Sequence, residues 1–236
     1  IGKPAEEVAS CSEEKTVSEA INYRRSVRIY DPEKIMDPKI VKKCLEQAAL
    51  APNSSNMQLW EFCHITSKDI LKKMEPLCLN QNTAKTAQEL VVFVTRKDLW
   101  RNRAKANLEM VNKIYPTNPN SKKNKREKII RSYYGKLIPL VYNDFLGLLG
   151  MFKYLIIIVV GLFRPMYREV RAQDIRVVTH KTCALAAENF MLSMAAEGYD
   201  TCPMEGTDTW RIKKLLKLPR GAEINMIVSC GIRKPE

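Results

Sequence analysis

The feature that most constrains the fold is a short apolar run, Leu90–Thr95 (LVVFVT), which has the length of one strand. In a strand, successive side chains point to opposite faces, so an unbroken apolar run predicts a sheet that is covered on both faces. Ile224–Ser229 is a second run of this kind, and Trp60–Thr66 is a third candidate strand. The 236 residues are enough to build such a covered sheet with a well-buried core.

Two amphipathic helices are predicted to flank this sheet. The first begins after Asp37, a residue type that caps helices, with Pro38 at the first helical position, and it ends before Pro52. The second covers residues 183–197 and closes at Gly198, a typical C-terminal cap. Strands and helices do not alternate regularly along the chain, which favours an α+β fold over a doubly wound parallel one. The apolar positions at three- and four-residue spacing are Ile40, Val41, Cys44, Leu45, Ala48 and Ala49 in the first helix and Cys183, Ala187, Phe190, Met191, Met194 and Ala195 in the second.

The composition indicates the redox compartment of the protein more clearly than the kind of molecule that it binds. A formal net charge of +13 suits a nucleic acid, a membrane surface or an anionic small molecule, and charge alone does not choose among them. The cysteines are odd in number, form no C-x-x-C pair and lie mostly in apolar stretches, as free thiols do in a reducing compartment. We expect a cytoplasmic protein without a disulfide framework or a metal site, although a targeting peptide before Ile1 would not be visible. The seven cysteines are Cys11, Cys44, Cys63, Cys78, Cys183, Cys202 and Cys230.

A first motif with chemical content is Arg24-Arg25-Ser26-Val27-Arg28, which precedes a turn at Asp31-Pro32. Three guanidinium groups and one hydroxyl within five residues suit a phosphate group, because guanidinium forms paired, charge-assisted hydrogen bonds to phosphate oxygens. Taken alone, the same pentamer is more often a solvated basic surface.

Two further motifs follow in order along the chain. Residues 51–60 read A-P-x-S-x-N-x-Q-x-W and lead into a predicted strand, and the helix at 183–197 leads through Gly198 into Pro203-Met204-Glu205-Gly206. Together with R-R-S-x-R and with Cys230-Gly231-Ile232-Arg233 after the last strand, these motifs resemble the FMN-dependent nitroreductase family. The resemblance covers residues 15–96 and 172–236, and its specificity lies in the combination, since each motif is weak alone. Leu59 departs from it, because the family commonly has proline there.

The resemblance implies how FMN would be bound. The arginine motif would hold the phosphate and ribityl end, with Arg233 as a candidate for a further basic contact. The second motif would meet the flavin from the partner subunit, and the third would lie along the isoalloxazine with a main-chain N–H of Glu205 or Gly206 directed toward N5. No side chain is required as a nucleophile or metal ligand. The implied cofactor-binding residues are Arg24, Arg25, Ser26, Arg28, Pro52, Asn53, Ser54, Asn56, Gln58, Pro203, Met204, Glu205, Gly206 and Arg233.

The family resemblance also implies a fold, a partner and an activity. The fold would be a central mixed, mainly antiparallel sheet flanked by helices in a domain-entwined homodimer. The activity would be the transfer of electrons from NAD(P)H to nitroaromatics, quinones or similar small acceptors by a ping-pong mechanism. Alternatives are a reductive dehalogenase of the same fold, a quinone reductase, or a flavin-binding protein at a membrane surface. His64 and His180 accompany no Ser or Cys motif and are expected to be structural.

Residues 97–171 match nothing in the resemblance and are expected to be a helical insertion in a single domain that spans residues 1–236. They contain a helix-like stretch, Trp100–Ile114, and a basic run from Lys122 to Arg131 that we interpret as a solvated linker, because no nucleic-acid-binding motif accompanies it. They also contain an apolar segment, Leu137–Phe163, whose uninterrupted part is well short of the roughly 20 residues needed to span a bilayer. We expect this segment to pack over the flavin pocket or the dimer interface, with Lys153 reaching solvent or a partner, in preference to contacting a membrane.

Overall fold

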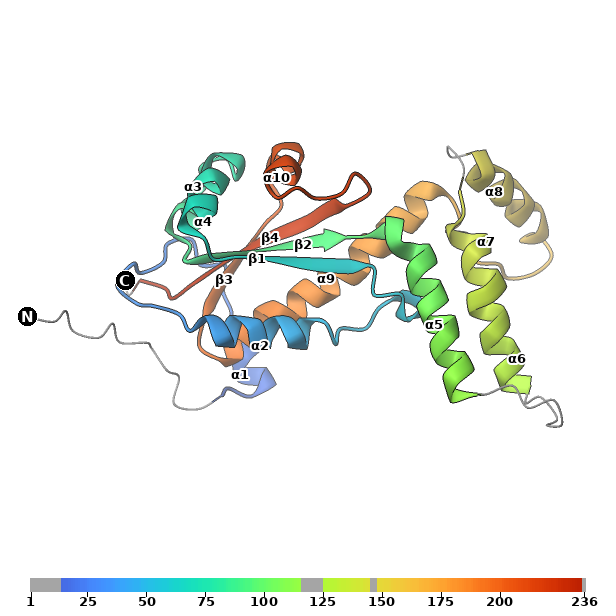
Figure 1. Ribbon diagram of the computed structural model, residues 1–236, viewed down its shortest axis with the longest axis horizontal. Coiled ribbons are helices and arrows are strands. Elements are labelled where there is room, and N and C mark those ends of the chain that lie inside the picture. Colours follow the sequence, from blue (N-terminus) through green and yellow to red (C-terminus); the bar gives the residue numbers. More distant parts are fainter. Residues whose placement is uncertain (1–13, 116–124, 145–147, 235–236) are drawn as a thin grey trace, which may run out of the picture. The chain divides into compact units, whose positions relative to one another are not determined.

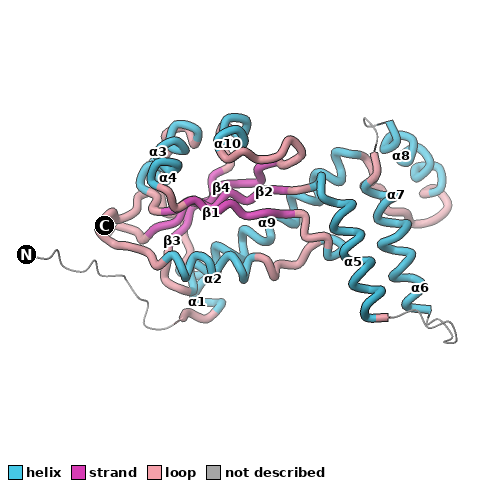
Figure 2. Tube along the Cα trace, in the orientation of Figure 1, coloured by secondary structure: helices cyan, strands magenta, loops and turns pink. Residues whose placement is uncertain are grey.

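Four antiparallel strands form the sheet in the computed structural model, which describes residues 14–115, 125–144 and 148–234 (Figure 1). The strands lie in the order β1-β2-β4-β3 (Figure 2). Every adjacent pair is antiparallel, and the parallel pairing among the described residues is an isolated bridge between Ser26 and Thr201. The strand bounds are Trp60–Ile65 for β1, Glu89–Thr95 for β2, Asp200–Met204 for β3 and Glu223–Gly231 for β4.

The predicted burial of both sheet faces is confirmed along β2. Its side chains alternate, so that Val91 and Phe93 enter a core with α2 and the part of α9 after Thr182. Leu90, Val92 and Val94 enter a second core with α3, α4 and α10. Because each core is closed by helices, none of these β2 side chains is exposed to solvent. The helix bounds are Val17–Tyr23 for α1, Pro38–Ala48 for α2, Lys68–Leu77 for α3, Asn82–Thr86 for α4, Ala172–Ala196 for α9 and Thr209–Leu215 for α10.

The two predicted helices form, with different lengths. The Asp37 side chain accepts a hydrogen bond from the Lys39 amide at 2.9 Å, and Pro38 occupies the first turn of α2 as expected. The second helix, α9, begins at Ala172, well before the expected start at residue 183, and Gly198 follows it with a left-handed φ of 81°. The apolar periodicity detected only the half of α9 that packs on the sheet.

Contacts divide the chain into two compact units. The sheet unit comprises Ile1–Pro52, Trp60–Thr95 and Thr182–Glu236, and the helical unit comprises Asn53–Leu59 and Arg96–Lys181. The expected single domain with an insertion at 97–171 thus stays a prediction, although the second unit nearly coincides with that insertion. Cys11, Lys122 and Lys123 lie outside the described residues.

The helical unit has its own small core. Met57 and Leu59 are buried there with Ala104, and Trp100–Ile114 forms a helix with the predicted bounds. The remaining members of this core are Ile138, Tyr142 and Ile175. The helices of this unit are α5 (Trp100–Ile114), α6 (Lys125–Ser132), a π-helical turn (Tyr133–Leu137), α7 (Ile138–Tyr142), α8 (Leu148–Val160) and the beginning of α9, and short 3₁₀ turns lie at Ser54–Asn56 and Lys97–Leu99.

Replacing Gly231 with alanine is expected to lower the free energy of unfolding by about 1–3 kcal/mol, the usual range for overpacking. A Cβ atom at Gly231 would overlap the ring and Cβ of Tyr30, a fully buried side chain that has no room to move. Urea denaturation measures the loss. Gly206→Ala is the matched control, because a Cβ there meets no atom within 4 Å. Equal stability of the two variants would contradict the packing argument.

Candidate functional site

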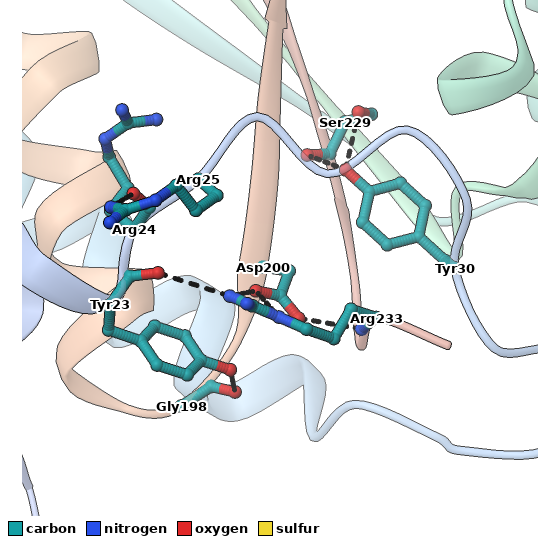
Figure 3. Close-up of polar contacts among 8 residues, drawn as sticks. All are labelled: Tyr23, Arg24, Arg25, Tyr30, Gly198, Asp200, Ser229 and Arg233. Atoms are coloured by element: carbon teal, nitrogen blue, oxygen red, sulfur yellow. Dashed lines mark hydrogen bonds and ion pairs between the residues drawn. The ribbon is translucent and has the colours of Figure 1, made fainter. Parts of the chain in front are cut away.

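The arginine motif lies on an extended segment that runs beside β3. Ser26 bridges Thr201, and the Val27 amide donates to the Thr201 carbonyl at 3.2 Å. At its end, Tyr30 bridges Arg233, and its hydroxyl lies 2.8 Å from Ser229 Oγ (Figure 3). Burial raises the pKa of the Tyr30 phenol, which therefore stays a neutral anchor. The first motif is thereby held beside β3, the strand on which the third motif begins.

This segment borders a cavity of about 700 Å³ in the sheet unit. Arg25 and Arg28 contribute guanidinium groups to its wall and Ser26 contributes a hydroxyl. Such a wall suits a doubly charged phosphate, because the guanidinium groups can neutralise its charge and all three side chains can donate hydrogen bonds to its oxygens. Arg24 does not line the cavity, and its main-chain carbonyl accepts a hydrogen bond from Arg25 Nη1 at 2.7 Å. The lining residues are Arg25, Ser26, Val27, Arg28, Ile29, Arg233 and Lys234.

Arg233 reaches the same cavity but is engaged by a buried carboxylate. Its Nη2 atom lies 2.5 Å from Asp200 Oδ1, and its main-chain amide donates to Asp200 Oδ2 at 2.7 Å. Nη2 also donates to the Tyr23 carbonyl at 3.2 Å, and the guanidinium lies over the Tyr23 ring (Figure 3). The Asp200 carboxylate raises the pKa of Arg233. Its proposed contact with phosphate stays a prediction, and its structural role is to join the chain end to β3.

The Pro203-Met204-Glu205-Gly206 motif begins on β3 and continues into an exposed loop. Met204 is buried, whereas Glu205 and Gly206 are exposed. Two hydrogen bonds to residues at and after the end of α3 fix this loop. Gln81 Nε2 donates to the Gly206 carbonyl at 2.9 Å, and the Asp208 amide donates to the Leu77 carbonyl at 2.8 Å. No atom of the described chain would touch a Cβ at Gly206, so the space above this glycine can admit a ligand.

The second motif belongs to the helical unit from Asn53 onward. Ser55, Asn56 and Gln58 all have left-handed φ angles between 46° and 56°, a conformation that non-glycine residues rarely adopt. Such strain persists only where neighbouring groups impose it, and it is typical of functional loops. Asn53 contributes one of those constraints, because its Oδ1 accepts a hydrogen bond from the Gln58 amide at 2.8 Å.

Residues of the insertion impose the rest of this loop's conformation, and sequence reasoning missed them. The Tyr133 hydroxyl lies 2.5 Å from Ser55 Oγ, and the Tyr134 hydroxyl donates to the Ser55 carbonyl at 3.1 Å. Asn107 Nδ2 donates to the Asn56 carbonyl at 2.9 Å. The adjacent tyrosines were the available signal, and they lie on a π-helical turn, an element that is frequent at functional sites.

The same tyrosines border a cavity of about 220 Å³ inside the helical unit. Its wall is mainly apolar, and the polar groups on it come from serine and tyrosine. Burial raises the pKa of Tyr142 to about 12, so this phenol is a neutral hydrogen-bond donor near neutral pH. The lining residues are Ser54, Ser55, Tyr133, Leu137, Ile138, Val141, Tyr142, Tyr167, Ile175 and Val178.

Other titratable groups have structural roles. His64 Nε2 lies 2.5 Å from the buried carboxylate of Glu89 on the neighbouring strand. Burial raises the pKa of Cys44 and of Cys183 to about 12, which leaves both as unreactive thiols. The six described cysteines are free. In the part of the chain that the structure describes, no three His, Cys, Asp or Glu side chains gather closely enough to hold a metal ion.

The fold and the cationic cavity define a class of protein, the α+β proteins with the nitroreductase-like fold. The nitroreductase family model matches residues 21–232, and the chain belongs to that family. It is 26% identical to protein DrgA of Synechocystis over 91% of this chain and 83% of DrgA. It is 25% identical to a Staphylococcus haemolyticus protein predicted to be an NAD(P)H nitroreductase, over 95% of this chain and 92% of the relative.

Solved structures share the fold at lower identity. A predicted NAD(P)H:FMN oxidoreductase from Staphylococcus epidermidis has a TM-score of 0.70 and 16% identity, covering 97% of this chain and 92% of the other. The FMN complex of a predicted nitroreductase from Exiguobacterium sibiricum has a TM-score of 0.64 and 20% identity, covering 97% and 94%. The resemblance to the family and the α+β fold with a helix-flanked antiparallel sheet, both expected from the sequence, are therefore confirmed.

Proposed function

We propose that the protein is an FMN-dependent oxidoreductase that passes electrons from NAD(P)H to a small oxidised acceptor such as a nitroaromatic or a quinone. The observation that carries the proposal is the cavity walled by Arg25, Ser26 and Arg28, on a segment that is bridged to β3, the strand that leads into the exposed loop at Glu205-Gly206. The names of the relatives and the FMN bound to a structural neighbour support the same activity.

The residues present fit FMN in charge and in space. Arg25 and Arg28 would neutralise the phosphate, and Ser26 would add a short donor. The open space at Gly206 would let the main chain approach the isoalloxazine edge, where main-chain donors favour the reduced, anionic ring. Bound FMN would supply the redox chemistry by accepting a hydride from NAD(P)H and then reducing the acceptor. The chain would supply positioning, and no side chain needs to act as a nucleophile.

The strained loop at Asn53–Gln58 supports a homodimeric site. In this proposal Asn56 and its neighbours contact the flavin of a second copy, and Tyr133, Tyr134 and Asn107 hold the loop in the required conformation. The adjoining cavity of about 220 Å³, apolar with tyrosine hydroxyls on its wall, suits a flat acceptor that carries one or two oxygens.

The visible spectrum of the purified protein tests the function. We expect flavin absorption near the usual position of about 450 nm, bleaching on addition of NADH or NADPH, and return of colour when a quinone or nitroaromatic is added. Light scattering on the same sample should give the mass of a dimer. A protein that stays colourless after incubation with FMN would contradict the enzyme assignment, and a flavin-loaded monomer would contradict the shared site.

A further inference from the structure

Helix α8 has its polar and apolar faces reversed. Its large side chains at three- and four-residue spacing, which would normally form a core stripe, are 57–85% exposed, and the stripe continues through the turn that follows the helix. Gly150 and Lys153 instead face the helical unit and are buried. We call this stripe the α8 apolar face; it consists of Leu148, Met151, Phe152, Leu155, Val159, Leu162 and Phe163.

The reversal is stabilised by the only charged residue of α8. Lys153 Nζ donates to the carbonyls of Leu140 at 2.8 Å, Val141 at 3.3 Å and Asn143 at 2.6 Å, at the C-terminal end of α7. These are carbonyls that a helix end leaves without intrahelical partners, and a cation there is stabilised by the helix dipole. Of the two environments expected for Lys153, the structure gives it partners and not solvent. The expectation that the aliphatic run packs over the flavin pocket or the dimer interface stays a prediction, and within one chain its outward side is exposed.

We propose that the α8 apolar face rests on an anionic lipid surface, with the helix axis in the plane of the membrane. A helix with apolar side chains outward and its charge turned inward matches an apolar medium and not water. Among the described residues, no helix is long and apolar enough to cross a bilayer, so α8 would lie on the surface instead of spanning it. The proposal is independent of the proposed redox function.

Cations and aromatic rings border this face, which is the composition of an interfacial helix. Arg164 follows the stripe directly, and Arg168 Nη2 lies 3.5 Å from the Gly161 carbonyl at its end. Arg171 lies over the ring of Tyr154 on α8, while it also pairs with Asp174. Exposed arginines beside an exposed apolar stripe are attracted to anionic headgroups, and tyrosine favours the membrane–water interface.

An apolar cavity of about 280 Å³ opens between α7 and α8 next to this face. Its wall includes the exposed side chains Leu140 and Ile156 and is otherwise aliphatic, apart from Tyr167 and the stem of Lys153. A cavity of this chemistry can take part of one acyl chain, which would strengthen attachment to lipid.

A second copy of the chain fits this face less well. In a two-fold symmetric contact centred on this face, residues near the axis meet their own copies, so the arginines that border the face would lie near each other without acidic partners. A lipid surface that contains anionic headgroups complements both the apolar stripe and its cationic border.

Flotation with large unilamellar vesicles tests the proposal on the whole chain. Vesicles of phosphatidylcholine with about one third phosphatidylglycerol should carry the protein to the top of a sucrose gradient, and phosphatidylcholine alone should carry much less. Replacing Leu155, Val159 and Phe163 together with serine should reduce partitioning at least about tenfold. Arg164→Gln with Arg168→Gln should weaken binding to the anionic vesicles only. The matched control is Leu50→Ser with Leu79→Ser, which removes exposed leucines of the sheet unit and should leave flotation unchanged.

A tryptophan reporter covers the case in which the triple variant fails to fold. The single change Leu155→Trp should show a blue shift of emission with anionic vesicles and quenching by brominated lipid. Absence of flotation by the unaltered protein overturns the proposal, and so does an unshifted reporter. If the triple variant instead loses its dimer mass while the unaltered protein does not float, the face belongs to a second copy and the proposal is wrong.

Discussion

Replacing Arg28 with alanine should weaken FMN binding by about ten- to a hundredfold, because it removes a charge-assisted hydrogen bond to phosphate worth roughly 1.5–3 kcal/mol. Arg25→Ala should act similarly, since both guanidinium groups line the same cavity of about 700 Å³. Arg24→Ala should have a smaller effect, because Arg24 ends α1 and does not line that cavity. Titration of the apoprotein with FMN, followed by quenching of flavin fluorescence, gives the Kd of each variant.

Riboflavin, which lacks the phosphate, separates a phosphate contact from a general loss of the site. The affinity of the Arg28→Ala protein for riboflavin should equal that of the unaltered protein. Lys39→Ala on α2 is the charge-matched control, because it removes one exposed cation that does not line the cavity and should leave the Kd for FMN unchanged. An equal loss for riboflavin and FMN would show that the arginine acts on folding, and no loss for either would place the phosphate elsewhere.

The sequence predicts best the elements whose own residues determine both their secondary structure and which of their faces are buried. Leu90–Val94 is apolar at every position, so side chains on both faces of the strand are apolar, and both faces of β2 are buried. Asp37 and Pro38 start α2 through contacts within one helical turn. Arg25, Ser26 and Arg28 line one cavity because consecutive residues in an extended segment cannot separate far, and their contact with phosphate stays a prediction.

The parts that escaped prediction depend on contacts between distant residues. The strain at Ser55 and Asn56 is imposed by Tyr133, Tyr134 and Asn107, some fifty to eighty residues later, and no local pattern encodes those pairings. The insertion was expected to be helical and α8 is a helix, but the sequence does not predict the direction in which this helix faces. That direction is set by three main-chain carbonyls that bind Lys153. Because every residue has a main-chain carbonyl, the sequence does not show which ones a lysine will bind.

Arg233→Ala should lower the free energy of unfolding by about 3–5 kcal/mol, because it leaves the buried carboxylate of Asp200 without its counter-charge. The side chain of Asp200 is 1% exposed, and its oxygens accept hydrogen bonds from the Arg233 guanidinium and from the Arg233 amide. The pair also joins the segment after β4 to β3, beside the segment that carries Arg25 and Arg28. Guanidinium chloride denaturation measures the loss. Glu109→Ala, which removes an exposed pair with Lys105, is the control and should cost no more than about 0.5 kcal/mol.

The variant Asp200→Asn separates this structural role from a direct contact between Arg233 and phosphate. It should also destabilise the fold, because the charge-assisted hydrogen bonds between the buried Asp200 carboxylate and Arg233 are lost, but it leaves the guanidinium free to turn toward the cavity that Arg233 lines. If Arg233 contacts phosphate, Arg233→Ala weakens FMN binding while Asp200→Asn preserves it, and riboflavin binding is the same in both. If Arg233 acts only through Asp200, both variants weaken FMN and riboflavin alike. The double variant Asp200→Asn/Arg233→Gln should recover part of the stability, since no unpaired charge stays buried. A single-variant loss below about 1 kcal/mol, typical of an exposed ion pair, would show that the pair is solvated and not part of the buried structure.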